Sequence, residues 1–279
     1  MAPLSAAPRH PRLHSQSAFT LVELLVVLAV VATLAGMLVP TLARARSRAA
    51  EAGCRNNLRQ LGLAMMLYLP DNLDVFPAVA SKDAGGPMRE DWVFWNVHLP
   101  GVESYFLNPR NSAIGPYMGH FNTNLFRCPA DQDVLDREDA LLRNPTSGNP
   151  YLYSYALTSL VDTTRNRGIG SVYAWDRAPL HYYSHRIVNP ADKLMLVEDN
   201  GDPRHAELLT GDPNRVIDDG RWVPTADALS ARHRYNRGRA VTKSDLLNLG
   251  RGSVQFSDGH VGTLSPAQAR LTAHCDPSK

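Results

Sequence analysis

The chain has 279 residues, a formal net charge of +2 and three cysteines. This length suffices for one sizeable globular domain, or for two small ones, in addition to an anchor. The near-neutral charge gives no indication of a nucleic-acid partner. No C-x-x-C pair occurs in the sequence, so a zinc-ribbon or thioredoxin-type site is not indicated.

The N-terminus combines a basic leader with a long apolar run. Residues 1–18 contain arginines but no acid, and residues 18–42 form an apolar run in which Glu23 is the only charge. About 20 apolar residues can cross a membrane as a helix, so we predict a membrane-spanning helix over residues 19–42. A secretory signal peptide has a shorter core with a small-residue cleavage site after it, and no such site follows this run.

Glu23 is the most informative residue of the apolar run. A charged side chain at the centre of a membrane helix costs roughly 2.5–3.5 kcal/mol on insertion scales, so we expect this carboxylate to have a function. A simple membrane anchor is the alternative interpretation, but it leaves Glu23 unexplained.

The order of residues around Glu23 resembles the class III signal of type IV prepilins and type II secretion pseudopilins. The basic leader ends in a small residue, Ala18, then Phe19 begins the apolar run, and Glu23 is the fifth residue counted from Phe19. The resemblance implies that a prepilin peptidase cuts between Ala18 and Phe19 and methylates the new amine. It also implies that Glu23 is an assembly contact that pairs with the Phe19 amine of a neighbouring subunit. Most of the family has Gly where this chain has Ala18.

The helical pattern continues beyond the membrane segment. Over residues 43–69, apolar residues recur at helical spacing along one face, so this half of the helix is predicted to be amphipathic. Its apolar stripe needs a cover, and the rest of the chain can supply a sheet. Pro40 removes one amide donor and clashes with the carbonyl of Gly36, so we expect a kink or fraying between Gly36 and Pro40. The residues of the stripe are Leu58, Leu61, Met65 and Tyr68.

Residues 70–279 are predicted to form the globular domain. The apolar run at residues 193–198 is the best candidate for a central strand, and residues 92–97 are expected to form an aromatic strand. Two segments rich in turn residues, 199–222 and 234–252, are predicted to be long loops. The predicted fold is therefore α+β and pilin-like, with a long helix packed on an antiparallel sheet.

The C-terminal part predicts a β-hairpin followed by a short helix. Asp258-Gly259 separates two alternating segments, and both residues are expected to take positive φ in a tight turn. Val254 and Phe256 are expected to face the core together. Residue 265 is a serine that precedes a proline, which is the usual start of a helix.

The body of the chain has a second resemblance, to the large prepilin-like proteins of the planctomycete and verrucomicrobial type. The similarity covers Ala52-Gly53-Cys54-Arg55-Asn56-Asn57, Phe126-Arg127-Cys128-Pro129-Ala130-Asp131 and the end of the chain. That family carries a processing-associated C-terminal motif of His, nine residues and Asp-Gly. Here the candidates are His233, Asp258 and Gly259, with 24 residues between His233 and Asp258. We interpret residues 234–252 as an insertion. A metal or catalytic site of Asp258, His260 and His233 is the rival interpretation of these residues.

The cysteines and the acidic loops leave alternatives open. Two of the three cysteines could form a disulfide in an exported domain, or all three could be small buried hydrophobic residues. Oxygen-rich loops could bind calcium, but Asp and Asn are also the usual turn residues, and we expect no cofactor. The cysteines are Cys54, Cys128 and Cys275, and the acidic loops are Asp71-Asn72-Asp74, Asp131-Asp133 and Asp199-Asn200-Asp202.

The sequence favours a filament subunit of a type IV pilus or type II secretion pseudopilus. Its expected partners are a prepilin peptidase, other subunits and the inner membrane, with the C-terminal domain outside the cytoplasm. The arginine cluster at positions 44, 46 and 48 conflicts with this orientation by the positive-inside rule, but the signal is the more specific feature. No catalytic motif is present, so no enzymatic activity is expected.

The alternative function is a membrane-anchored extracytoplasmic module that binds carbohydrate. Aromatic side chains could form a sugar-stacking surface if several of them were exposed on one face. Buried core aromatics are the other explanation for them. The residues are Trp92, Trp95, Tyr151, Tyr153, Tyr173, Trp175, Tyr182, Tyr183 and Trp222.

Overall fold

The computed structural model describes most of the chain and divides it into two compact units, Met1–Arg46 and Ser47–Lys279. The leader with Ala18, and Phe19 after it, lie outside the described residues. The structure describes residues 20–81, 86–95, 103–132, 151–159, 168–174, 177–211, 217, 219–224, 227–233 and 242–279.

Helix α1, Leu21–Asp71, is the longest element and contributes to both units. It ends two residues beyond the predicted end of the amphipathic half at residue 69. Among the described residues it is the one helix that is long and apolar enough to cross a membrane. Its residues 21–49 are all exposed, whereas buried side chains begin at Cys54. The change from exposed to buried therefore occurs along a single helix, as the change in sequence pattern predicts.

The fraying expected around Gly36 and Pro40 does not occur. Helix α1 is continuous through both residues. The Thr41 hydroxyl donates to the carbonyl of Leu38 at 2.8 Å and lies 3.4 Å from that of Met37. A proline removes only one amide donor, and the intact hydrogen bonds of the neighbouring turns keep the helix together.

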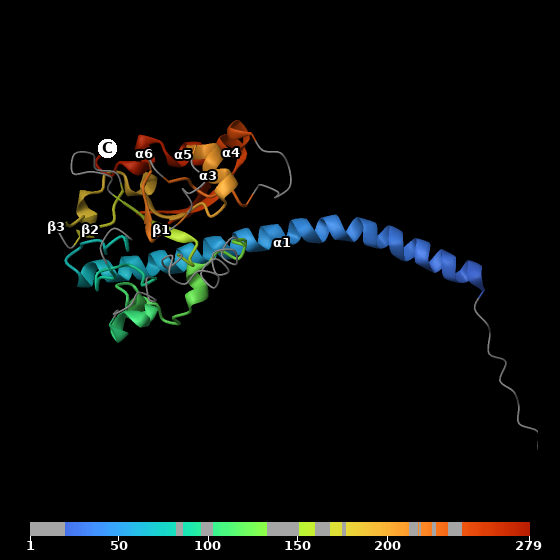
Figure 1. Cartoon of the computed structure of the whole chain (residues 1–279), viewed down its shortest axis with the longest axis horizontal. Coiled ribbons are helices and arrows are strands. Elements are labelled where there is room, and N and C mark those ends of the chain that lie inside the picture. The colour runs from blue at the N-terminus through green and yellow to red at the C-terminus, as the bar shows by residue number, and fades with distance from the viewer. Residues whose placement is uncertain are drawn as a thin grey trace, which may run out of the picture. The chain divides into compact units, whose positions relative to one another are not determined.

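Seven strands form two sheets in the described part of the chain. Strands β1, β2 and β3 are labelled in Figure 1. The larger sheet has the order β5-β1-β4-β6-β7, so β4 is its central strand, as the apolar run at 193–198 predicts. The β1–β5 pair is parallel and the other pairs of this sheet are antiparallel, so the sheet is mixed rather than purely antiparallel. The bounds are β1 Tyr155–Thr158, β2 Val172–Ala174, β3 Arg177–Leu180, β4 Leu194–Glu198, β5 Arg221–Trp222, β6 Gly252–Phe256 and β7 Val261–Leu264.

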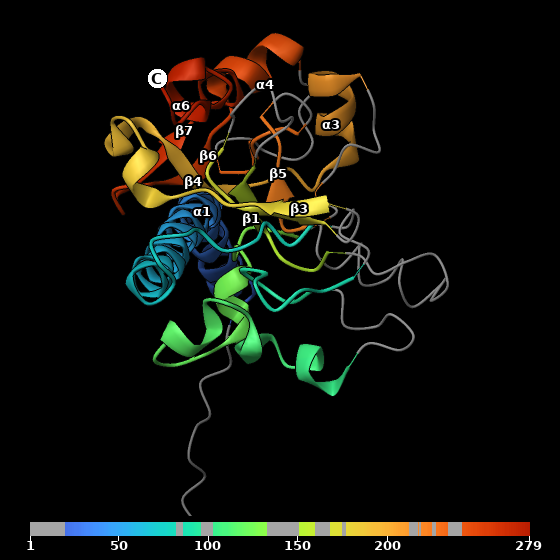
Figure 2. The same ribbon diagram turned by 90° about the vertical axis from the view of Figure 1, so that its left-hand side faces the viewer.

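Within Ser47–Lys279, the large sheet separates two hydrophobic cores. The amphipathic half of α1 lies against one face, and short helices cover the other (Figure 2). These helices are α3 Pro203–Thr210, α4 Lys243–Leu249, α5 Pro266–Ala269 and α6 Thr272–Cys275. Short 3-10 turns complete the unit: η2 Ser104–Leu107, η3 Pro109–Asn111, η4 Gly115–Tyr117, η5 Thr123–Phe126, η6 Ser184–Arg186 and η7 Pro190–Asp192.

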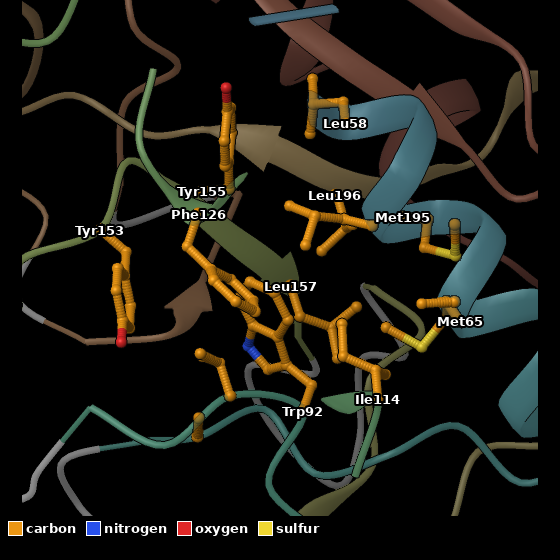
Figure 3. Close-up of a cluster of buried hydrophobic side chains, with 14 of the residues drawn as sticks. Leu58, Met65, Trp92, Ile114, Phe126, Tyr153, Tyr155, Leu157, Met195 and Leu196 are labelled. Carbon is orange, nitrogen blue, oxygen red and sulfur yellow. The ribbon is translucent and has the colours of Figure 1, made fainter. Parts of the chain in front are cut away.

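The core on the α1 side is the larger one and is rich in aromatic residues (Figure 3). All four residues of the predicted apolar stripe of α1 are buried in it. The partners labelled in Figure 3 come from β1, β4 and the segments between α1 and β1. The partners labelled in the figure are Trp92, Ile114, Phe126, Tyr153, Tyr155, Leu157, Met195 and Leu196.

A register shift in β4 decides which of its side chains face α1. The pairing of β4 with β6 is irregular between Leu194 and Leu196. Met195 and Leu196 both contribute to the α1-side core, whereas Leu194 and Val197 contribute to the second core. A bulge of this kind interrupts the usual alternation of side chains.

The aromatic strand expected at residues 92–97 is wrong for the residues that the structure describes. Trp92 to Trp95 do not belong to a sheet. Their indole groups bond to backbone carbonyls instead, from Trp92 to Gly220 at 2.9 Å and from Trp95 to Ala80 at 2.8 Å. Large aromatic side chains that reach an acceptor in a core do not require a strand backbone.

The two predicted long loops each contain a helix. In residues 199–222, the Asp202 side chain accepts the Arg204 amide, Pro203 opens α3, and Gly211 ends it with φ +87°. This segment also includes β5. In residues 234–252, of which 234–241 lie outside the described part, α4 begins at a capping box formed by Thr242 and Asp245. The turn-forming residues act here as helix caps.

The predicted C-terminal hairpin and the helix after it are confirmed. Strands β6 and β7 pair antiparallel, and Ser265 caps α5. Of the two turn residues, only Gly259 has positive φ, at +92°, so the expectation that Asp258 also takes positive φ is wrong. The turn closes from the Gly259 amide to the Phe256 carbonyl at 2.9 Å, which places Asp258 at a central position with ordinary negative φ. Val254 and Phe256 face the second core, not α1.

Candidate functional site

The start of α1 holds Glu23 in a local capping arrangement. The Thr20 amide and hydroxyl both donate to Glu23 Oε2 at 2.8 Å, and the Glu23 amide donates to Thr20 Oγ1 at 3.3 Å. This is the reciprocal pattern of a capping box, with Thr before the helix and Glu three residues later. Glu23 therefore has a partner in its own chain. The residues of the predicted cleavage, Ala18 and Phe19, lie outside the described part.

The apolar segment that follows offers a continuous hydrophobic surface. Its large side chains are all exposed, from 46% at Leu42 to 74% at Leu21. A soluble monomer rarely exposes an apolar surface of this extent. The arrangement suits a segment that lies in lipid or against other helices.

A second group of functional side chains lies inside the globular unit, around Glu198. Glu198 is the last residue of β4 and is fully buried. Its Oε2 accepts hydrogen bonds from His233 Nε2 at 2.7 Å and from the Ser253 amide at 3.0 Å. Its Oε1 lies 3.3 Å from Arg232 Nε. One carboxylate on the central strand thus joins three segments that are distant in sequence.

Arg232 extends this group to a second carboxylate. Its Nη1 lies 2.8 Å from Asp131 Oδ2, and its Nη2 donates to the Asp199 carbonyl at 2.9 Å. The Ser154 hydroxyl donates to Asp131 at 2.6 Å and accepts the Cys128 amide at 2.9 Å. The charges of Arg232 are therefore shared between two buried carboxylates, as a buried ion pair requires.

A disulfide between Cys54 and Cys128 borders the cluster and decides the pairing that the sequence leaves open. It links α1 to the segment before β1. His233 Nε2 lies 3.7 Å from Cys128 Sγ. The third cysteine, Cys275, is buried, and its thiol donates to the Ala269 carbonyl at 2.8 Å. We refer to Cys54, Cys128, Glu198 and His233, whose ligand-type atoms all lie within 4.8 Å of one another, as the Cys–His–Glu cluster.

The electrostatics of the cluster keep Glu198 ionised. Burial acts to raise the pKa of Glu198, but the charges of His233 and Arg232, with hydrogen bonds from His233 and Ser253, outweigh it and hold the pKa below its usual value. Because the carboxylate is ionised, it can only accept, so the proton of the His233 bond belongs to Nε2. His233 Nδ1 is buried and has no hydrogen-bond partner among the described residues.

The structure separates the two halves of the predicted C-terminal motif. The amide of His233 donates to the Arg251 carbonyl just before β6, whereas Asp258 and Gly259 form the turn after β6. Five residues of extended strand span about 17 Å. Asp258 instead pairs with His260, at 2.6 Å from Oδ1 to Nδ1. The rival site of Asp258, His260 and His233 is therefore not assembled.

The sequence pattern indicates His233 but not its partners. It does not indicate Glu198 or Arg232 as site residues, it offers Asp131 only as part of a possible calcium loop, and it does not specify the pairing of Cys54 and Cys128. Two local signals point to them: a carboxylate ends the most apolar strand, and an arginine precedes the histidine. Neither signal names the residue that it will contact, because the contacts join distant segments.

The residues expected in other sites have structural contacts. Of the acidic loops, Asp131 belongs to the buried cluster, Asp202 caps α3 and pairs with Arg204, and Asp71 accepts from the Tyr117 hydroxyl. Five of the nine aromatic residues proposed for a sugar-stacking surface are buried, while Trp175 lies outside the described residues. The buried ones are Trp92, Tyr151, Tyr153, Tyr182 and Trp222.

Comparison with known families agrees with both resemblances. Residues 13–39 match the family model described as Prokaryotic N-terminal methylation motif. Residues 43–179 match the one described as Protein of unknown function (DUF1559). These two matches end before His233 and Asp258. No curated protein and no solved structure gives a significant match.

The methylation motif on an apolar helix and the sheet-covered second half of that helix define a pilin-like protein. The chain carries a prokaryotic N-terminal methylation motif at residues 13–39, followed at residues 43–179 by a segment similar to the DUF1559 family.

Proposed function

We propose that this chain is a structural subunit of a pilus-like or pseudopilus-like filament and not an enzyme. It is inserted in the inner membrane by α1, processed by a prepilin peptidase before Phe19, and assembled with other subunits of the same type. The observation that carries the proposal is the matched methylation motif, which includes most of an exposed apolar segment of α1, residues 21–42, whose only charge is Glu23.

The Cys54–Cys128 disulfide supports an orientation in which the globular unit lies outside the cytoplasm. Stable disulfides form mainly outside the cytoplasm, and both cysteines lie after the apolar segment. The arginines that follow the segment favour the opposite orientation by the positive-inside rule. We therefore propose that the globular unit lies on the extracytoplasmic side, and the disulfide and the methylation motif support this orientation.

The contacts of Glu23 suggest how assembly would proceed. In the single chain its carboxylate is bonded to Thr20. A neighbouring Phe19 amine would add a cationic partner, which a carboxylate in lipid requires if it is to stay ionised. On assembly, the Phe19 amine of the neighbouring subunit would then either replace the hydrogen bonds that Thr20 donates to Glu23 or add to them.

Processing is tested by mass spectrometry of the full chain extracted from membranes that contain a prepilin peptidase. The expected mature chain begins with N-methylated Phe19. A chain with an intact N-terminus, or one cut beyond Arg44, would refute the proposal.

Assembly is tested with Glu23→Ala, which should insert and fold normally but enter filaments less efficiently. Glu51→Ala, in the same helix beyond the apolar segment, is the matched control and should assemble as the unchanged chain does. Thr20→Ala removes the cap alone. If it impairs assembly as strongly as Glu23→Ala, then Glu23 acts by capping and not as an intersubunit contact.

A further inference from the structure

The Cys–His–Glu cluster contains a buried histidine and a buried carboxylate that a disulfide does not require. A disulfide is held by its own covalent bond, and its sulfur atoms are weak hydrogen-bond acceptors. Yet a buried histidine and a buried carboxylate lie directly against it, with His233 Nε2 at 3.7 Å from Cys128 Sγ. Burying these groups is costly unless they are paired. Two sulfurs, one imidazole nitrogen and one carboxylate oxygen converge on a common point.

We infer that the reduced chain binds one zinc ion through Cys54, Cys128, His233 and Glu198, and that this zinc site is the alternative to the disulfide. Zinc takes four ligands in tetrahedral geometry, and thiolate, imidazole and carboxylate are its usual donors. Zn–S and Zn–N lengths of about 2.3 and 2.0 Å separate tetrahedral ligands by roughly 3.3–3.8 Å. The four atoms already lie within 4.8 Å of one another, so closing around an ion needs only small movements.

The surrounding groups suit such a site. The Ser253 amide and Arg232 bond to the Glu198 carboxylate and would continue to orient it as a ligand. Outer partners of this kind are typical of metal-binding carboxylates. His233 Nδ1 makes no hydrogen bond in the described structure, so the ring proton can move from Nε2 to Nδ1 without breaking a bond there.

The zinc ion and its two thiolates add no net charge to the cluster. In either state Glu198 and Asp131 are negative and Arg232 is positive. In the zinc state the two thiolates add two negative charges, and the ion adds two positive ones. The same ion-pair partners can therefore surround either state, whereas two metal-free thiolates would leave an uncompensated buried charge.

The exchange between the states is a two-electron thiol–disulfide reaction. A dithiol reductant donates two electrons to the Cys54–Cys128 bond and becomes a disulfide itself. Zinc takes the two thiolates, and the two protons of the dithiol go to solvent. In the reverse direction a disulfide oxidant accepts the two electrons and becomes a dithiol by taking up two protons, the Cys54–Cys128 bond forms, and zinc is released.

The inference is tested on the full chain in detergent, prepared once with its disulfide and once refolded under reducing conditions with zinc. After removal of free metal, elemental analysis should find about one zinc ion per chain in the reduced sample and none beyond background in the oxidised one. Cys275→Ser is the matched control, since it removes the cysteine outside the cluster and should retain the ion. Cys54→Ser/Cys128→Ser should lose it. This double variant keeps all ten histidines, so it measures adventitious binding.

Cobalt substitution supplies a readout that does not depend on any variant folding. Co²⁺ added to the reduced, unchanged chain should give the visible bands of a tetrahedral ion and the near-ultraviolet charge-transfer band of thiolate ligation. Reoxidation should abolish both. The inference fails if the reduced chain holds no more zinc than Cys54→Ser/Cys128→Ser, or if bound Co²⁺ shows no thiolate band. These results do not depend on filament assembly, so they leave the proposed function untouched.

Discussion

At the scale of single residues, Asp91 is another buried carboxylate, and its environment differs from that of Glu198. Its side chain accepts the Met88 amide at 2.9 Å, but burial and the nearby charges of Glu90 and Asp219 disfavour its ionised form. Burial is the largest of these effects, and together they raise the pKa of Asp91 from its usual 3.8 to about 7. Glu198, by contrast, is held ionised by cations.

The raised pKa of Asp91 predicts a specific dependence of stability on pH. Well below its usual pKa of 3.8 the group is protonated in both the folded and the unfolded chain. As the pH rises from about 4 to about 7, the unfolded chain ionises while the folded chain stays protonated, so this group's contribution to stability falls, by roughly 4 kcal/mol in total. Asp91→Asn should therefore match the unchanged chain at pH 4 and melt at a higher temperature at pH 8.

Thermal melts of the full chain between pH 4 and 8 measure this difference. Asp74→Asn is the control, because Asp74 is exposed, and its effect should not change with pH. An Asp91→Asn variant that melts lower than the unchanged chain at pH 8 would contradict the prediction.

At the scale of elements, the contact between α1 and β6 depends on a glycine. A Cβ at Gly62 would overlap the side-chain amide of Gln255, which is 1% exposed. Overpacking of this kind typically costs about 1–3 kcal/mol. The small residue in α1 thus allows the helix to approach the sheet closely.

Gly62→Ala should lower the free energy of unfolding by about 1–3 kcal/mol. Adding Gln255→Ala should recover part of that loss, because the two side chains occupy the same space. Gly36→Ala in the same helix is the control, since a Cβ there meets no atom within 4 Å. Denaturant unfolding of the unchanged chain, Gly62→Ala, Gln255→Ala and their double variant gives the coupling energy, and additive losses for the two single variants would refute the contact.

The hairpin between β6 and β7 gives a second prediction at this scale. Gly259 has φ +92°, and a Cβ there meets nothing within 4 Å, so Gly259→Val should cost about 1–3 kcal/mol through backbone strain alone. Asp258→Asn should change the stability by less than about 0.5 kcal/mol, because the amide oxygen can still accept the His260 N–H. Thermal melts with and without EDTA compare the two. A large loss for Asp258→Asn together with a drop on chelation would indicate a metal site at the turn.

At the scale of the whole molecule, the disulfide ties the buried half of α1 to the segment before β1 within the globular unit. Cys54 and Cys128 are 74 residues apart in sequence. Cross-linking a loop of this length stabilises the folded chain by up to about 4–5 kcal/mol, chiefly by restricting the unfolded chain. The helix thus contributes to the core through both its apolar stripe and a covalent bond.

Loss of this bond should therefore lower the stability of the whole globular unit. In the presence of a chelator, Cys54→Ser/Cys128→Ser should unfold at a lower denaturant concentration than the oxidised chain. Its free energy of unfolding should be lower by roughly 2–5 kcal/mol. Cys275→Ser, which breaks no disulfide, is the control. Equal midpoints for the double variant and the oxidised chain would show that the disulfide does not stabilise the fold.

The sequence by itself determined the features whose physical cause is local. The apolar run and its carboxylate predicted the membrane-type segment of α1, the 3.6-residue period predicted its buried stripe, and Asp258-Gly259 predicted the hairpin. The apolar run at 193–198 predicted the central strand. Each of these signals lies within a few residues of the structure that it specifies. Where a local signal is ambiguous, the prediction was wrong: the turn residues Asp202 and Gly211 are the caps of α3.

Only the tertiary structure decided which distant side chains meet. Cys54 pairs with Cys128, Glu198 joins His233 and Arg232, and His233 lies far from Asp258. These contacts depend on strand order, on the register shift in β4 and on which face of the sheet α1 covers. Residue periodicity places a side chain on one face of its own element, but it does not specify the partner element that packs there. The Cys–His–Glu cluster therefore exists only in the folded chain, where helix α1, strand β4 and the two connecting segments that contain Cys128 and His233 bring its members together.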